Sequence, residues 1–229
     1  MCFSATASFT AGVSLLIVGV MTISRVRNRK DLLYALIPML FAIQQLIEGA
    51  MWLTFPAKAP LLKMVLTYAY SVFSHVLWPM YIPIAVLLLE PTAWRRKVLI
   101  AISVSGTFIG LYLLYFLVRF PIEAEVIGHH IVYISPHFYA LYAMGLYLLG
   151  TCISSLFSSH RMVKLFGVAA FVSFMLAYAI YATWFISVWC FFAAILSWIV
   201  LLYFLLRRVE DKQMVDISKP TKQKLHLAL

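Results

Sequence analysis

Long runs of apolar residues alternate with short polar segments along the chain, and seven runs are long enough to cross a membrane as helices. The predicted spans are residues 7–24, 32–55, 62–89, 98–120, 138–157, 165–183 and 184–206. A helix of about twenty apolar residues matches the ~30 Å hydrocarbon thickness of a bilayer and satisfies its own backbone hydrogen bonds there. The runs are continuous rather than alternating, which argues against a β-barrel. We therefore predict an all-α polytopic membrane protein, a seven-transmembrane helix bundle.

The boundary between the last two spans is the uncertain one. Residues 165–206 contain no charged residue and are twice as long as one crossing requires. A tight turn near Thr183 and Trp184 divides this stretch into two spans. The alternative, six spans, needs this stretch to be re-entrant.

Basic residues test this arrangement independently, because cytoplasmic loops are enriched in Lys and Arg. Of the eighteen Lys and Arg residues, fifteen fall on one side of the seven spans. They are Arg25, Arg27, Arg29, Lys30, Arg95, Arg96, Lys97, Arg161, Lys164, Arg207, Arg208, Lys212, Lys219, Lys222 and Lys224. The opposite side has Lys58, Lys63 and Arg119. The amino terminus is then predicted to be external and the carboxyl terminus cytoplasmic.

Composition agrees with this class of protein. The chain is 64% hydrophobic and 11% charged, with a mean hydropathy of +0.97, whereas soluble domains contain about 25% charged residues. The net charge of +10 is explained by topology and does not indicate nucleic-acid binding, so the expected partners are the lipid bilayer and a small ligand or ion. We predict one transmembrane domain over residues 1–209 and a polar cytoplasmic tail over residues 210–229. The sequence does not indicate an oligomeric state.

Polar residues within the spans are the best indication of function, because an ionisable group in a span costs about 2.5 kcal/mol or more on insertion scales. The second span carries one polar stripe at helical spacing and the third span carries another. The expected ligand-binding residues are Gln44, Gln45, Glu48, Tyr68, Ser71, Ser74, His75 and Trp78, with Tyr142 of the fifth span as an aromatic lining. Together they predict an outward-facing polar cavity. The alternative is a hydrogen-bonded contact between helices, which polar residues commonly make in membranes.

The loop over residues 121–136 is predicted to face outside and to lie on the helix ends, because apolar residues alternate with its polar ones. Its imidazoles suggest a transition-metal site for zinc, iron or copper above the polar stripes. The candidate ligands are Glu48, His75, His129, His130, His137 and Cys2. Adjacent histidines point in different directions on most backbones, and the spacing matches no established metal motif. Cys2 is otherwise explained as a small or acylated interfacial residue.

The start of the chain, Met1-Cys2-Phe3-Ser4-Ala5 followed by Ala7-Ser8-Phe9, resembles an uncharacterised family of small bacterial multi-pass membrane proteins, a domain of unknown function. The segment from Gln45 to Gly49 with Trp52 adds to this resemblance. It implies a location in the bacterial inner membrane and implies no activity.

Several seven-span classes are excluded by missing residues. The last span has no lysine for a retinal Schiff base, and the cysteines offer no external disulfide of the receptor type. Paired halves of the kind seen in sugar transporters are not evident, and a late His-x-x-x-His pattern of ceramidase-like hydrolases is missing. The predicted function is transport or sensing of a small ligand or ion. An intramembrane metal-dependent enzyme using Glu48, His75 and the loop histidines, or a structural scaffold, are the alternatives.

Overall fold

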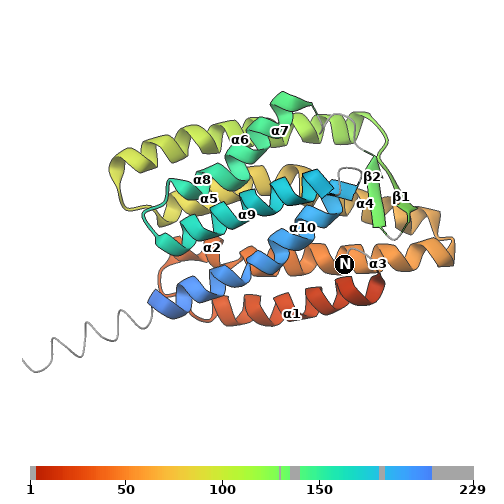
Figure 1. Ribbon diagram of the computed structural model, residues 1–229, viewed down its shortest axis with the longest axis horizontal. Coiled ribbons are helices and arrows are strands. Elements are labelled where there is room, and N and C mark those ends of the chain that lie inside the picture. Colours follow the sequence, from red (N-terminus) through yellow and green to blue (C-terminus); the bar gives the residue numbers. More distant parts are fainter. Residues whose placement is uncertain (1–3, 129, 135–139, 181–183, 208–229) are drawn as a thin grey trace, which may run out of the picture.

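The chain folds into a bundle of helices that run along one long axis, with a β-hairpin at one end (Figure 1). This computed structural model describes residues 4–128, 130–134, 140–180 and 184–207. In this part of the chain, six helices are long and apolar enough to cross a membrane: Ala5–Ile23, Arg29–Ala57, Pro60–Leu89, Ala93–Arg119, Arg161–Ile180 and Phe185–Arg207. A further apolar helix, Leu141–Leu156, is shorter. By helix length and composition the chain is a multi-pass membrane protein.

Several of these long helices are divided into shorter elements. In chain order the elements are α1 (Ala5–Ile23), η1 (Arg29–Asp31), α2 (Leu32–Ala35), α3 (Ile37–Ala57), α4 (Pro60–Ser71), η2 (Val72–Leu77), α5 (Trp78–Leu89), α6 (Ala93–Arg119), β1 (Glu123–Ile127), β2 (His130–Ile134), α7 (Leu141–Leu148), η4 (Leu149–Ile153), α8 (Ser154–Leu156), α9 (Arg161–Ile180) and α10 (Phe185–Leu196).

Each of the seven predicted spans coincides with one apolar helix, and the fifth differs most from its prediction. The sequence predicts a full span over residues 138–157, whereas the helix is Leu141–Leu156. At 1.5 Å per residue that helix rises about 24 Å, which is less than the ~30 Å of a hydrocarbon core. The orientation of the helices in a membrane stays a prediction.

The loop after α6 is a β-hairpin, an element that the all-α prediction did not include. Its strands pair antiparallel, with Glu123 opposite Ile134 and Ile127 opposite His130. Gly128 at the turn has a φ of +66°, a conformation that glycine adopts without strain. The alternating β-branched residues that predicted a segment lying on the helix ends also favour paired strands.

One face of the hairpin is buried against the bundle. The side chains of Ala124, Ile131 and Tyr133 are buried, and β1 lies against α4 while β2 lies against α10. The hairpin therefore covers one end of the helices, as the sequence predicted for this loop.

Two π-helical turns, η2 and η4, interrupt the third and the fifth apolar helices. Such turns insert one extra residue and leave backbone groups without their usual partners. The Tyr147 hydroxyl, at the end of α7, donates a hydrogen bond of 2.5 Å to the carbonyl oxygen of Ser74 in η2. The two irregular segments are thus joined by a buried tyrosine.

Close backbone contact surrounds Pro79, one residue into α5. A Cβ atom on Gly106 of α6 would lie 2.0 Å from the Pro79 carbonyl oxygen, and one on Gly150 of η4 would lie 2.7 Å from it. Only a residue without a side chain fits at either position. Small residues allow membrane helices to pack this closely.

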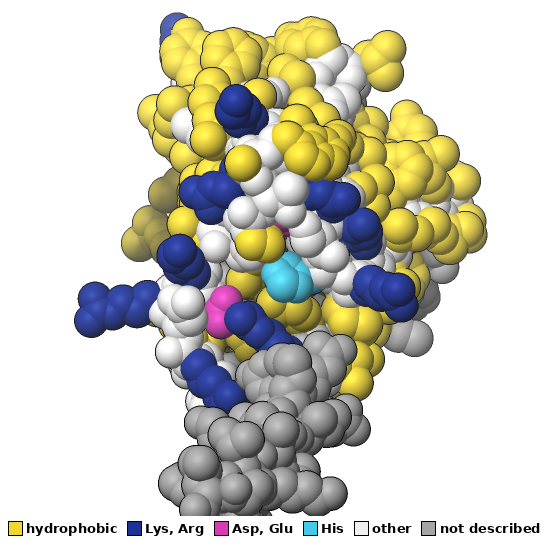
Figure 2. All heavy atoms as spheres, turned by 90° about the vertical axis from the view of Figure 1, so that its left-hand side faces the viewer, with side chains coloured by type: hydrophobic (Ala, Val, Ile, Leu, Met, Phe, Trp, Pro, Cys, Tyr) yellow, Lys and Arg dark blue, Asp and Glu magenta, His cyan; other side chains and the backbone are white. Residues whose placement is uncertain are grey.

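Lys and Arg side chains gather on the end of the bundle opposite the hairpin (Figure 2). Two of them bind carbonyl oxygens at helix ends: Arg95 Nη1 donates to Ser158 O at 2.7 Å, and Arg96 Nη1 donates to Glu90 O at 3.2 Å. Cationic groups are favoured at the carboxyl ends of helices, where carbonyl oxygens are left without partners. These residues thus fix the connections at this end as well as supplying its charge.

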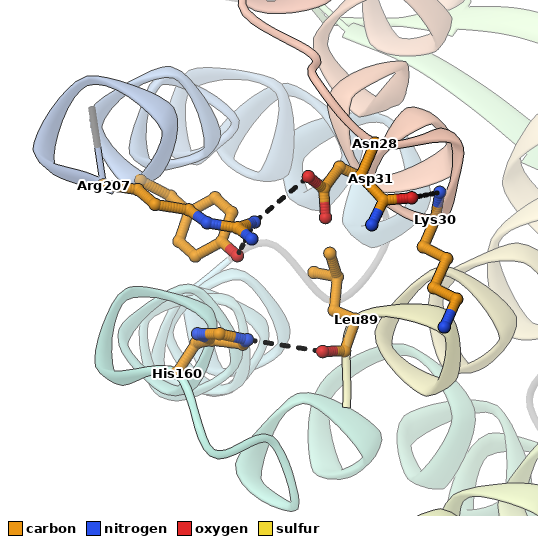
Figure 3. A network of polar contacts seen from close by, with 7 residues as sticks. Asn28, Lys30, Asp31, Leu89, His160 and Arg207 are labelled. Atoms are coloured by element: carbon orange, nitrogen blue, oxygen red, sulfur yellow. Dashed lines mark hydrogen bonds and ion pairs between the residues drawn. The ribbon is translucent and has the colours of Figure 1, made fainter. Parts of the chain in front are cut away.

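Polar contacts across this end join the second long helix to the last one, and the third to the connection before α9 (Figure 3). Arg207 forms an ion pair with Asp31 at 3.1 Å and donates to the Tyr203 hydroxyl at 3.2 Å. A ring nitrogen of His160 lies 3.3 Å from the carbonyl oxygen of Leu89. This ion pair and these hydrogen bonds therefore connect the elements that meet at the basic end.

Glu90, directly after α5, is a second buried acid at this end, in addition to Asp31. Its carboxylate accepts the backbone N–H and the hydroxyl of Ser159, both at 2.5 Å, and the backbone N–H of Thr92 at 3.0 Å. Burial raises the pKa of Glu90, but these hydrogen bonds outweigh it and hold the pKa below its ordinary value of 4.5. Glu90 thereby ties the α5–α6 connection to the α8–α9 connection.

Candidate functional site

A group of polar side chains lies inside the bundle on α3. Gln44, Gln45 and Glu48 are each 0% exposed. Because α3 is a regular helix, residues three and four positions apart project from the same side, and here that side faces the interior. All three side chains are therefore buried within the bundle, and their role in binding a ligand stays a prediction.

Glu48 binds the last apolar helix. The hydroxyl of Ser187 on α10 donates a hydrogen bond of 2.5 Å to Glu48 Oε1. This bond does not come from the third helix, whose polar stripe the sequence predicted to share a cavity with Glu48. We call the group formed by Gln44, Gln45, Glu48, Ser187 and Cys190 the Glu48 cluster.

Gln44 connects this cluster to the third and last helices. Its Oε1 accepts a hydrogen bond of 2.8 Å from the indole N–H of Trp78, and the Trp78 ring stacks on Phe41 with a centroid distance of 3.9 Å. The Cys190 side chain of α10 lies close to Gln44 and Tyr70. Three helices therefore meet at Gln44.

Like the amide nitrogen of Gln44, the polar side-chain atoms of Gln45 have no hydrogen-bond partner in the described part of the chain. The Ser8 hydroxyl on α1 is likewise buried without such a partner. Buried polar groups are nearly always hydrogen-bonded, and an exception calls for an explanation. A bound polar ligand or ion would satisfy the Gln45 amide.

The polar stripe predicted on the third helix is also buried. Two of its residues, Ser74 and His75, lie in the π-helical turn η2. Ser71, Ser74, His75 and Trp78 are between 0 and 3% exposed. The Ser74 hydroxyl lies 2.8 Å from His75 Nδ1. The π-helical turn thus holds a serine–histidine pair in the interior, one helix away from Glu48.

The hairpin covers the cluster from the end of the bundle. The Tyr133 ring of β2 stacks on Tyr70 with a centroid distance of 4.4 Å and an interplanar angle of 5°. Trp184 donates from its indole to the carbonyl oxygen of Ile127 at 3.1 Å, and its ring lies 4.8 Å from that of His130. Because Tyr70 in turn reaches Cys190, a continuous set of contacts runs from the hairpin to the cluster.

A small cavity of about 30 Å³ adjoins the cluster, a volume that holds one or two water molecules. Its walls are mainly aromatic and include Phe41, Trp78, Tyr147, Phe166, Trp189 and Cys190. Trp78 and Cys190 belong both to this wall and to the contacts of Gln44. The sequence predicts a polar cavity that opens outward, and that feature stays a prediction.

Two of the predicted ligand-binding residues lie away from the cluster. Tyr142 is 61% exposed and its hydroxyl bonds to that of Tyr112 at 2.5 Å. Tyr68 packs beside Val76 in a separate apolar group. Neither residue is brought to Glu48.

The predicted metal site can be traced only in part. Cys2, His129 and His137 lie outside the described residues. Within the described part of the chain, no three His, Cys, Asp or Glu side chains are grouped closely enough to hold a metal ion. The metal site therefore stays a prediction.

Ser187, Cys190 and Tyr147 are site residues that the sequence analysis did not select. Ser187 and Cys190 are spaced three residues apart in an otherwise apolar span, which places them on one side of a helix. This spacing of two polar residues in an apolar span is the sequence signal that could have identified them.

The comparisons with known proteins identify a family and no activity. A family model described as "Family of unknown function (DUF6629)" matches residues 1–216. No curated protein and no solved structure matches the chain.

Proposed function

The chain belongs to the DUF6629 family of unknown function, and from that premise we propose that it binds a small polar ligand or a cation at the Glu48 cluster and serves in transport or sensing. The observation that carries the proposal is the buried Gln45 amide, which has no described hydrogen-bond partner, beside the buried Glu48 carboxyl. A polar ligand beside the Glu48 carboxyl would supply the hydrogen bonds that the Gln45 amide lacks.

The energetics favour a functional role for this cluster. Placing an ionisable group in a membrane span costs about 2.5 kcal/mol or more, so such groups are rare and usually serve function. One serine hydrogen bond contributes about 0.6 kcal/mol on average between membrane helices. The Ser187 hydrogen bond alone therefore does not offset the cost of an acid at position 48.

The position of the cluster suits reversible access. It lies between α3 and α10, near the hairpin, and Tyr133 packs on Tyr70 above it. The charge distribution predicts this end to be external, in the bacterial inner membrane. Entry of the ligand from outside, past the hairpin, is part of the proposal.

Binding is tested first by elemental analysis of the detergent-purified protein, comparing wild type with Glu48→Gln, His75→Ala and His130→Ala. Unfolding temperature is then measured with added Na⁺, Mn²⁺ and Zn²⁺, and any ion that raises it is tested for flux into proteoliposomes. We expect the shift in wild type and its loss in Glu48→Gln. Glu123→Gln, on the exposed side of β1, is the matched control.

The outcomes separate the candidate functions. Near-stoichiometric metal that is lost in Glu48→Gln and His75→Ala would favour the metal-dependent enzyme or a metal-handling protein. A wild type without bound metal and without a response to any probe, together with a Glu48→Gln variant that changes only stability, would contradict the proposal and favour a structural scaffold.

A further inference from the structure

A second pocket, separate from the Glu48 cluster, opens at the turn between α3 and α4. Its volume is about 300 Å³. It is lined by Thr54, Phe55, Lys58, Ala59, Pro60 and Lys63. The pocket lies where two apolar helices end, at the level expected for lipid headgroups or the water beside them.

The charge of this pocket is positive. It is lined by two lysines and no acid, and among the described residues neither lysine forms an ion pair. The Lys63 ammonium lies 5.8 Å from the centroid of the Phe55 ring, a cation–π contact that holds the side chain over the pocket. Lys58 and Lys63 are two of the three basic residues on their predicted side of the membrane.

The backbone adds to this positive charge. Helix α4 begins at Pro60, which lines the pocket, and a helix amino end carries a partial positive charge. Lys58, the C-cap of α3, has a φ of 49° and a ψ of 45°. Glycine is the usual residue in this left-handed position, and a side chain here costs about 1 kcal/mol. In this chain the position is occupied by a lysine.

We propose that this pocket binds a phosphate-type anion, either the phosphate of an anionic lipid headgroup or free phosphate. Two ammonium groups and the amino end of a helix are together the donors that phosphate binding needs. The pocket volume exceeds that of the phosphate group alone and leaves room for a glycerol substituent. This inference does not depend on the function proposed for Glu48.

The test compares two sources of phosphate on the purified full-length chain. Native mass spectrometry measures retention of phosphatidylglycerol against phosphatidylcholine. Unfolding temperature in nonionic detergent is measured with inorganic phosphate, against chloride at equal ionic strength. The variants are Lys63→Gln, Lys58→Gly, which suits the backbone at that position, and the double variant. Arg119→Gln, the third basic residue of that side, is the control.

We expect each single variant to weaken binding about tenfold, as for loss of one charge-assisted contact, and the control to leave binding unchanged. Preferential retention of phosphatidylglycerol identifies the lipid source, and a phosphate-specific rise in unfolding temperature identifies free phosphate. Equal binding by wild type and the double variant, or no response of wild type in either experiment, overturns the proposal.

Discussion

Glu48 and Glu90 are both buried acids that accept a hydrogen bond from a serine, yet their surroundings differ. The Glu90 carboxylate receives hydrogen bonds from two backbone N–H groups and one hydroxyl, all in chain connections. Glu48 lies within a long helix and binds a side chain of another helix, next to the unsatisfied Gln45. A carboxylate that receives several hydrogen bonds from groups in chain connections is typical of a structural role. We therefore assign Glu90 to stability and propose Glu48 for function.

Glu90→Gln should change how stability depends on pH. The folded-state pKa of Glu90 is lowered, so the carboxylate stabilises the fold above its ordinary pKa, and this contribution is lost as the pH falls through the folded-state pKa. We expect the unfolding temperature of wild type in detergent to drop between about pH 5 and pH 3. The variant should be less stable by about 1 to 2 kcal/mol near neutral pH and should show a flatter pH profile. Identical profiles would contradict the assignment.

Ser187→Ala should weaken the contact between α3 and α10. It removes the donor to Glu48 while leaving the acid buried. We expect a loss of about 1 kcal/mol, in the range measured for hydrogen bonds between membrane helices, by denaturation in mixed micelles. Ser173→Ala is the control, because that hydroxyl bonds to a carbonyl of its own helix. A loss no larger than that of the control would show that the Ser187 bond contributes nothing.

At the scale of elements, the interior is arranged around Pro79 and the two π-helical turns. Gly106 and Gly150 let α6 and η4 approach the Pro79 carbonyl oxygen. Tyr147 links η4 to η2 by its bond to Ser74. These contacts set the rotation of α5 that directs Trp78 toward Gln44. The small aromatic cavity and the Glu48 cluster therefore depend on the same packing contacts.

Gly106→Ala should destabilise the bundle, because its Cβ atom would lie 2.0 Å from a backbone oxygen that cannot move freely. The expected loss is about 2 to 3 kcal/mol, as for overpacking. Gly145→Ala in α7 meets nothing within 4 Å and should be neutral or stabilise by up to about 1 kcal/mol. Thermal unfolding of both variants in detergent measures the difference. Equal unfolding temperatures would contradict the close approach.

The hairpin is the element that controls access to the cluster in our proposal. Cys190 is 3% exposed, and Tyr133 covers Tyr70 beside it. Tyr133→Ala should therefore speed labelling of Cys190 by a maleimide, by about tenfold if local opening becomes easier by about 1.4 kcal/mol.

The labelling experiment uses a chain in which Cys2 and Cys152 are replaced by serine, so Cys190 is the one remaining thiol. Val126→Ala, at an exposed hairpin position, is the control and should leave the rate unchanged. An unchanged rate in Tyr133→Ala would show that the hairpin does not limit access.

At the scale of the whole molecule, the two ends of the bundle differ in charge. Lys and Arg gather on one end (Figure 2), and the hairpin covers the other (Figure 1). The positive-inside rule then predicts that the basic end of the bundle faces the cytoplasm. Helix Leu141–Leu156 decides whether the two chain ends lie on opposite sides, because seven crossings separate them and six do not.

Orientation is tested by placing single cysteines in a cysteine-free chain. Glu125→Cys in the hairpin should react with a membrane-impermeant maleimide added to intact cells. Lys97→Cys at the basic end should react only after permeabilisation, and a fluorescent protein fused after Leu229 should fold in the cytoplasm. Labelling of both cysteines from the same side would contradict the predicted orientation.

The sequence by itself determined the class of protein, the positions of the apolar helices and the concentration of basic residues between them. These follow from local composition, because each span must match the bilayer thickness and satisfy its own backbone. It also indicated that Gln44, Gln45 and Glu48 belong to one polar stripe, because helical spacing fixes which residues share a side.

The tertiary structure decided which groups these residues meet. Ser187 is 139 residues from Glu48 along the chain, and helical periodicity carries no information about which helix packs opposite. The π-helical turns and the hairpin depend in the same way on contacts between distant segments, such as Tyr147 with Ser74 and Tyr133 with Tyr70. Local pattern sets what an element can bury, and packing between elements sets what it is buried against.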